Sequence, residues 1–143
     1  MTGLLAGIDI GGTKCAVSLG RVAGERIEIV EKTRFPTPTT PDATLEQFVT
    51  HLQMLLAKQG EPLTAIGISC GGPLDSRKGL ILSPPNLPEW DAVPIVQHFA
   101  SAFNVPVALQ NDANAGALAE WLWGAGQGCE NMIFLTFGTG MGA

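Results

Sequence analysis

Three short stretches hold residues whose types and spacing suit phosphate chemistry. A glycine-rich turn, Gly11-Gly12-Thr13-Lys14, follows the apolar segment 4–10, and a second turn, Gly138-Thr139-Gly140, follows the apolar segment 131–137. Such turns expose backbone N–H groups that can surround a phosphate. Between them, Asn111-Asp112 separates a strand-like run from a helix-like run. A carboxylate between two phosphate-type turns indicates phosphoryl transfer to a hydroxyl, with Asp112 as the general base.

Each stretch also has a purely structural interpretation. Asn111 can cap the following helix, and Asp112 can interact favourably with the helix dipole from the first turn. Glycine pairs are common in hairpin turns, and no helix follows Gly11-Gly12, as phosphate loops of the P-loop or Rossmann type require. Asp9 favours a functional interpretation, because a carboxylate within an apolar strand is costly unless it is used. Beside a nucleotide, Asp9 could hold Mg²⁺ directly or through water.

The long segment 74–91 contains several prolines and predicts an ordered binding loop. Asn86 can both donate to and accept from sugar hydroxyls. Trp90 could lie against an apolar sugar face or pin the loop to the body of the protein, and we favour the pinning role. Gly71-Gly72 ends the preceding apolar run, where it either makes a tight turn or lets the backbone approach a ligand.

Hydrophobic periodicity predicts a mixed α/β fold. Three strands joined by hairpins come first, at 4–10, 15–19 and 27–35, and helices then alternate with strands. The helices are expected near 45–56, 93–103 and 111–123, and the later strands at 63–70, 105–109 and 131–137. The run at 63–70 is continuous enough to be buried on both faces. This order predicts a mixed five-stranded sheet with three leading antiparallel strands and helices on its faces.

Composition excludes several classes of protein. The 143 residues are 45% hydrophobic and 15% charged with a net charge of −5, which is typical of a globular domain and not of a nucleic-acid-binding surface. No apolar run reaches the length of a membrane span. The three cysteines, Cys15, Cys70 and Cys129, form no pattern typical of zinc ligands or a disulfide framework. Their pattern favours a reducing, cytoplasmic location.

Taken together, the motifs resemble those of the ROK sugar kinases, in the actin-like, ribonuclease-H-like ATPase superfamily. Asp9 to Lys14 is similar to the first phosphate motif of the family, 111–114 to its sugar-binding and catalytic motif, and 137–142 to its second phosphate motif. The resemblance implies an ATP-dependent kinase for a hexose or N-acetylhexosamine, with Mg²⁺ at Asp9. It also makes Asp112 the base, the two glycine turns the ATP contacts, and four positions sugar contacts: Gly71, Gly72, Asn86 and Asn111.

The same resemblance implies two domains. We expect residues 1–112 to form the N-terminal actin-like ATPase subdomain, and residues 113–143 to form an interdomain helix and the opening strand and phosphate turn of a second, truncated domain. The chain is therefore expected to be the first part of a longer protein, which acts as a homodimer. Any zinc site of the family would lie in the later part.

Two other functions stay open. A non-catalytic sugar sensor or regulator of the same family would keep the fold without turnover, although the intact Asp112 counts against it. An acyl-phosphate kinase or chaperone-type ATPase would keep the phosphate turns without needing Asn111-Asp112. The sequence does not determine which sugar is used, because specificity among hexoses depends on small differences in the pocket.

Overall fold

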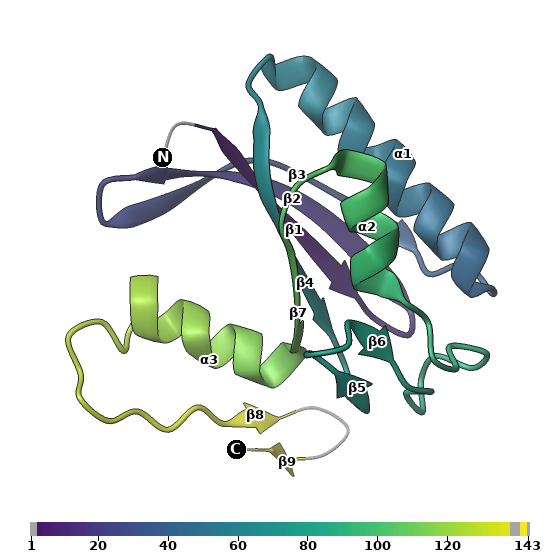
Figure 1. Cartoon of the computed structure of the whole chain (residues 1–143). Coiled ribbons are helices and arrows are strands. Elements are labelled where there is room, and N and C mark those ends of the chain that lie inside the picture. Colours follow the sequence, from purple (N-terminus) through teal and green to yellow (C-terminus); the bar gives the residue numbers. More distant parts are fainter. Residues whose placement is uncertain (1–2, 138–140, 143) are drawn as a thin grey trace.

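A computed structural model describes residues 3–137 and 141–142 of the chain (Figure 1). Nine strands and three helices occur in the described ranges, and none of the helices has both the length and the apolar character needed to cross a membrane. In chain order the elements are β1 (Leu4–Ile10), β2 (Lys14–Ala23), β3 (Arg26–Pro36), α1 (Pro41–Gln59), β4 (Leu63–Cys70), β5 (Leu74–Asp75), β6 (Leu80–Ile81), α2 (Ile95–Phe103), β7 (Val107–Asn111), α3 (Asp112–Trp123), β8 (Thr136–Phe137) and β9 (Met141–Gly142).

Five strands form one sheet in the order β3-β2-β1-β4-β7. The pairs β1–β2 and β2–β3 are antiparallel, whereas β1–β4 and β4–β7 are parallel. The predicted mixed five-stranded sheet with three leading antiparallel strands is therefore confirmed. Two short hairpins, β5–β6 and β8–β9, lie outside this sheet.

One face of the sheet carries the hydrophobic core. Strand alternation places Ile8 next to Val17 and Ile68, and Ile68 next to Leu109, all of them buried. The helices α1 and α2 lie on this side of the sheet (Figure 1). The apolar stripe of α1 that packs into the core consists of Leu45, Phe48, Leu52 and Leu55.

The helix α1 extends beyond the predicted range 45–56 at both ends, and residues with strong capping preferences set its limits. Thr40 is the N-cap, and its Oγ1 accepts a hydrogen bond from the N–H of Ala43 at 3.3 Å. Pro41 follows at the start, where its missing N–H costs no helical bond. Gly60 ends the helix with a left-handed φ of 69°, and its N–H donates to the carbonyl of Leu56. These caps fix both ends of α1 and hence the stripe that it presents to the core.

The opposite face of the sheet is lined by small side chains. Gly7 pairs with Ser18 and with Gly67, and Gly67 pairs with Ala108. Within β4, Ile66 and Ile68 are buried but Gly67 between them is exposed. The prediction that β4 is buried on both faces is therefore wrong for the described chain. The run at 63–70 gives a continuous apolar pattern because the alternate positions Ala65, Gly67 and Ser69 are small and uncharged.

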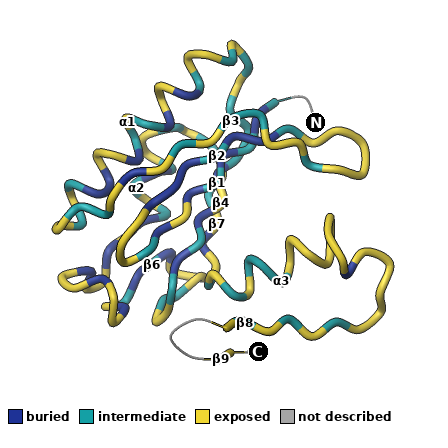
Figure 2. Tube along the Cα trace, turned by 180° about the vertical axis from the view of Figure 1, so that it is seen from behind, coloured by how far each residue is buried: buried dark blue, intermediate teal, exposed yellow. Residues whose placement is uncertain are grey.

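The helix α3 lies on the side of this open face and packs loosely. It has no buried residue, and Leu118, Trp121 and Trp123 are between 41% and 50% exposed. Figure 2 shows α3 and the segment after it mostly in the colours of exposed and intermediate residues. The predicted helices on both faces are thus present, although only α1 and α2 bury a hydrophobic core.

Several boundaries differ from the sequence predictions. α2 begins at Ile95 rather than at 93, because Val93 instead forms a β-bridge with Ile81. β7 ends at Asn111 rather than at 109, since its pairing with β4 continues to that residue. The predicted strand at 131–137 is reduced to β8, and a returning strand, β9, pairs with it.

Candidate active site

Three parallel strands end side by side at one edge of the sheet. Ile10 of β1 pairs with Cys70 of β4, and Cys70 pairs with Asn111 of β7. The carboxyl ends of parallel strands are where α/β sheets bind ligands. The residues that follow these three strand positions are Gly11, Gly71 and Asp112. The strand register therefore brings two glycine turns and a carboxylate to the same edge.

A cavity of about 110 Å³ lies at this edge. Its walls come from four segments: the turn after β1, the turn after β4, the proline-rich loop and the first residue of α3. Six of the residues singled out from the sequence line it: Gly11, Gly12, Gly71, Gly72, Asn86 and Asp112. The structure thus brings together segments that are up to about a hundred positions apart in the chain.

Asn111 is fixed at the start of α3 as its N-cap, as the sequence predicts. Its Oδ1 accepts hydrogen bonds from the N–H groups of Ala113 at 3.0 Å and Asn114 at 3.4 Å. The side-chain oxygen is therefore committed to the helix. The amide Nδ2 faces the turn after β4, where an added Cβ on Gly72 would lie 3.6 Å away from it. Asn111 can consequently present a hydrogen-bond donor to this region.

Asp112 lies in the first turn of α3 and is exposed. Its Oδ1 accepts a hydrogen bond from the N–H of Ala113 at 2.8 Å, and its Oδ2 would lie 4.0 Å from a Cβ added to Gly71. The carboxylate lies at the start of α3 and is accessible at the cavity. An accessible carboxylate in this position can act as a general base.

The turn after β1 is held by a residue that the sequence analysis did not identify. The Oγ1 of Thr37 donates to the carbonyl of Gly11 at 2.7 Å, and its N–H donates to the carbonyl of Thr13 at 3.0 Å. Within the turn, the N–H of Gly11 donates to the carbonyl of Lys14 at 3.1 Å. No local sequence signal could have found Thr37, because it lies 26 positions from Gly11 and meets it only through the pairing of β2 with β3.

We expect Thr37→Val to destabilise this turn with little change in shape. The substitution removes the hydroxyl that donates to the carbonyl of Gly11 and that also forms a hydrogen bond with the Sγ of Cys15, and losing the bond to Gly11 costs on the order of 1 kcal/mol. Urea denaturation would measure the free energy of unfolding. Thr39→Val is the matched control, because Thr39 is exposed and its hydroxyl bonds to none of the described residues. Equal losses in both variants would contradict the role given to Thr37.

The same turn offers free backbone donors. Gly12 and Thr13 are exposed, and neither donates its N–H to another residue in the described ranges. Lys14 is exposed beside them and adds a cation. Two accessible amides, a hydroxyl and an ammonium group are a suitable set of donors for a phosphate. The second predicted turn, Gly138-Thr139-Gly140, lies outside the described residues.

Asp9 lies on the open face of the sheet, next to the cavity edge. It is exposed, and its Oδ1 accepts a hydrogen bond from Ser69 at 3.3 Å. The burial cost that the sequence suggested therefore does not arise, because alternation along β1 directs Asp9 away from the core that holds Ile8 and Ile10. Among the described residues, no three His, Cys, Asp or Glu side chains gather as a metal site. A single carboxylate still suits Mg²⁺, which commonly takes one or two carboxylates together with phosphates and water.

The proline-rich loop is anchored by its apolar side chains. Trp90 is 1% exposed and Leu87 is 4% exposed, so both belong to the core. The preferred role of Trp90, pinning the loop to the body of the protein, is confirmed. Asn86 directly precedes Leu87 in the sequence but is exposed and lines the cavity.

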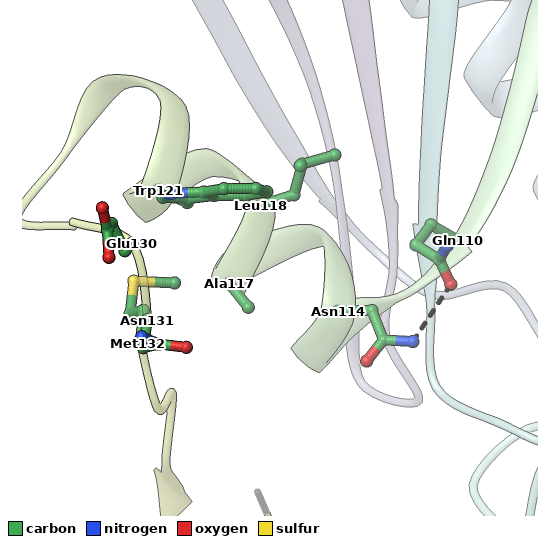
Figure 3. Close-up of a pocket in the computed structure, with 8 residues that line it drawn as sticks. All are labelled: Gln110, Asn114, Ala117, Leu118, Trp121, Glu130, Asn131 and Met132. Carbon is green, nitrogen blue, oxygen red and sulfur yellow. Dashed lines mark hydrogen bonds between the residues drawn. The ribbon is translucent and has the colours of Figure 1, made fainter. Parts of the chain in front are cut away.

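Two larger cavities flank α3. One, of about 560 Å³, lies between α3 and residues 130–132, where Asn114 donates to the side chain of Gln110 at 3.3 Å (Figure 3). The other, of about 460 Å³, lies between α3 and the open face of the sheet and is lined in part by Asp9. Neither is lined by Asp112 or Asn86. The small cavity at the strand ends is therefore the one around which the candidate catalytic groups gather.

The electrostatics at the strand ends affect the buried cysteines. Burial raises the pKa of the Cys70 thiol to about 12, and the nearby charges of Asp112 and Asp9 add to the rise. Burial also raises the pKa of Cys15, while a hydrogen bond between its Sγ and Thr37 opposes the rise. Both thiols therefore stay protonated at neutral pH.

We expect alkylation of the folded protein to modify Cys129 and to spare Cys15 and Cys70. The thiolate is the reactive form, Cys129 is exposed, and the other two thiols are buried with raised pKa values. Mass spectrometry after iodoacetamide treatment at mildly alkaline pH would identify the modified residues. All three should react in denaturant, which is the control. Modification of Cys70 as fast as Cys129 in the folded protein would contradict the closed packing at the end of β4.

Comparison with known proteins identifies the family. A model of the ROK family matches residues 5–143. The chain belongs to the ROK family. Among its ROK relatives, a glucokinase from Streptomyces coelicolor is 35% identical over 140 residues, which cover 98% of this chain and 42% of the relative. A fructokinase from Zymomonas mobilis is 34% identical, over 94% of this chain and 45% of the relative. The chain thus spans less than half the length of these curated relatives.

Solved structures of ROK proteins share the fold. A ROK hexokinase from Thermus thermophilus matches with a TM-score of 0.84 and 36% identity, covering 97% of this chain and 45% of that protein. A ROK family glucokinase from Streptomyces griseus, in complex with glucose and AMPPNP, matches with a TM-score of 0.77 and 34% identity, covering 98% and 43%. The predicted actin-like α/β fold is therefore confirmed.

Proposed function

We propose that this chain is the N-terminal part of an ATP-dependent kinase that phosphorylates a hydroxyl of a hexose or N-acetylhexosamine. The observation that carries the proposal is one cavity at the carboxyl ends of β1, β4 and β7. Asp112, Asn86 and the turns at Gly11-Gly12 and Gly71-Gly72 gather around it. The names of the relatives, glucokinase and fructokinase, support it. The bound glucose and ATP analogue of the Streptomyces griseus enzyme support it further.

In this proposal Asp112 accepts the proton of the attacking hydroxyl. The sugar occupies the cavity, where the exposed carboxylate of Asp112 lies next to the turn at Gly71. Asn111 donates from its amide nitrogen, because its oxygen is used in capping α3. Asn86, which lies on the proline-rich loop, contacts a further hydroxyl of the sugar. The side chains thus orient one hydroxyl toward the base, and positioning of this kind supplies much of the catalysis of phosphoryl transfer.

The nucleotide phosphates in turn lie against the turn after β1. The free amides of Gly12 and Thr13 and the cation of Lys14 bind phosphate oxygens, and Asp9 holds Mg²⁺ directly or through water. Mg²⁺ neutralises charge that develops on the transferred phosphoryl group. We further propose that the turn at 138–140 contributes a second set of amides, and that the boundary between the two domains lies at the start of α3, with residues 113–143 leading into the second domain.

Turnover of the full-length protein tests the proposal. ATP consumption would be measured with Mg²⁺ against a panel of hexoses and N-acetylhexosamines. Consumption with one sugar, together with a phosphorylated sugar detected by mass spectrometry, would support the kinase. Sugar binding without ATP consumption would instead indicate a sensor or regulator of the same family. Neither binding nor turnover with any sugar would exclude the proposed acceptor class.

A further inference from the structure

The turn after β1 and the proline-rich loop come close together at Gly12 and Asn86. A Cβ added to Gly12 would lie 2.7 Å from the Cβ of Asn86 and 2.7 Å from its backbone oxygen. Both distances are far below ordinary van der Waals contact, which is about 3.5–4.0 Å between carbon atoms. The two atoms belong to the backbone or are directly attached to it, so they cannot rotate away. The contact therefore exists only because position 12 has no side chain.

The need for glycine at position 12 comes from space and not from backbone conformation. Gly12 is not among the described glycines with positive φ, so an alanine could adopt its backbone angles. Gly11 differs, because a Cβ there would lie 2.6 Å from the carbonyl oxygen of Lys14 within the same turn. Gly11 thus shapes the turn itself, whereas Gly12 admits the neighbouring loop.

Neither partner in this contact can easily retreat. On one side, the two hydrogen bonds of Thr37 hold the turn. On the other, Leu87 and Trp90 fix the loop in the core, and the N–H of Ser83 donates to the carbonyl of Trp90 at 2.7 Å. Asn86 is therefore held between a braced turn and an anchored loop. A shift at position 12 would be transmitted directly to the side chain of Asn86.

We propose that Gly12 is a positioning residue for the proline-rich loop that carries Asn86, in addition to offering its amide to phosphate. Because position 12 has no side chain, the proline-rich loop can approach the turn after β1, and this approach determines the position of Asn86 in the cavity. The turn after β1 thereby controls the geometry of a sugar contact. This inference rests on the proposed function of the cavity. It makes a distinct claim, namely that sugar affinity depends on Gly12 even when no nucleotide is present.

Calorimetry on the full-length protein tests this claim. Gly12→Ala should weaken sugar binding measured without nucleotide by up to roughly 10-fold, the scale expected for the loss of one hydrogen bond from Asn86. Nucleotide affinity measured without sugar should change less than sugar affinity. Gly67→Ala is the matched control, because a Cβ there would meet nothing within 4 Å. Unchanged sugar affinity in Gly12→Ala, with nucleotide affinity lost, would overturn the inference.

A double-mutant cycle on thermal stability keeps the test independent of ligands. The melting temperature would be compared for the wild type, Gly12→Ala, Asn86→Gly and the double variant. Asn86→Gly removes the Cβ that Gly12→Ala would meet but keeps the backbone oxygen, so the loss caused by Gly12→Ala should be smaller, though not absent, in that background. Equal losses in both backgrounds would contradict the contact with the Cβ of Asn86. A wild type that binds no sugar would overturn the proposed function itself, whereas the thermal cycle would still report on the contact.

Discussion

Asp112→Asn in the full-length protein is expected to lower kcat by roughly 10²-fold to 10⁴-fold, the range contributed by a positioned general base. Asparagine keeps the size of the side chain and can still accept a hydrogen bond from the N–H of Ala113, as Asp112 does. It cannot accept the proton of the sugar hydroxyl. Sugar affinity should therefore change little, and the loss should fall on kcat. Steady-state kinetics at saturating sugar and ATP, with calorimetry for sugar binding, would separate the two.

Asp42→Asn is the matched control for this variant. Asp42 is also an exposed aspartate in the first turn of a helix, α1, so its removal costs a similar favourable interaction with a helix dipole. It is not among the residues that line the cavity at the strand ends. Its kcat should stay near that of the wild type. Near-normal kcat in Asp112→Asn, or an equal loss in Asp42→Asn, would show that Asp112 is not the base.

Local patterns predicted the parts of the site that depend on neighbouring residues in the chain. Asn111 was expected to cap a helix, and it does, because its side chain bonds to N–H groups two and three positions ahead. The three leading strands followed from short turns between apolar runs, and their pairing follows the chain order. The convergence of Gly11, Gly71 and Asp112 could be expected once the strands were taken as parallel.

Contacts between distant segments could not be predicted in this way. Nothing near Thr37 indicates that it holds Gly11, because that contact depends on the pairing of β2 with β3. Nothing near Gly12 indicates that it faces Asn86, because that contact depends on how the proline-rich loop packs. The expectation that β4 is buried on both faces failed for a related reason. Apolar and small residues look alike in a periodicity analysis, and Gly67 leaves its face of the sheet open.

The second large effect is expected from Asp9→Asn in the full-length protein. An amide is a weaker ligand than a carboxylate for a hard cation such as Mg²⁺, so the metal should be bound less tightly. Metal stabilisation of transition-state charge is worth several kcal/mol, so kcat at low Mg²⁺ should fall on the order of a hundredfold or more. High Mg²⁺ should restore part of the loss. The Mg²⁺ dependence of kcat would measure both effects.

Asp91→Asn is a close control for this change. Asp91 is exposed and accepts one hydroxyl hydrogen bond, from Ser83 at 3.4 Å, much as Asp9 accepts one from Ser69 at 3.3 Å. The two variants therefore remove the same kind of carboxylate and the same kind of hydrogen bond. Of the two aspartates, Asp9 is the one that lies next to the turn after β1. A loss in Asp9→Asn that Mg²⁺ does not relieve, with Asp91→Asn unaffected, would assign Asp9 a role in holding the open face of the sheet rather than the metal. Equal behaviour of the two variants would remove any special role for Asp9.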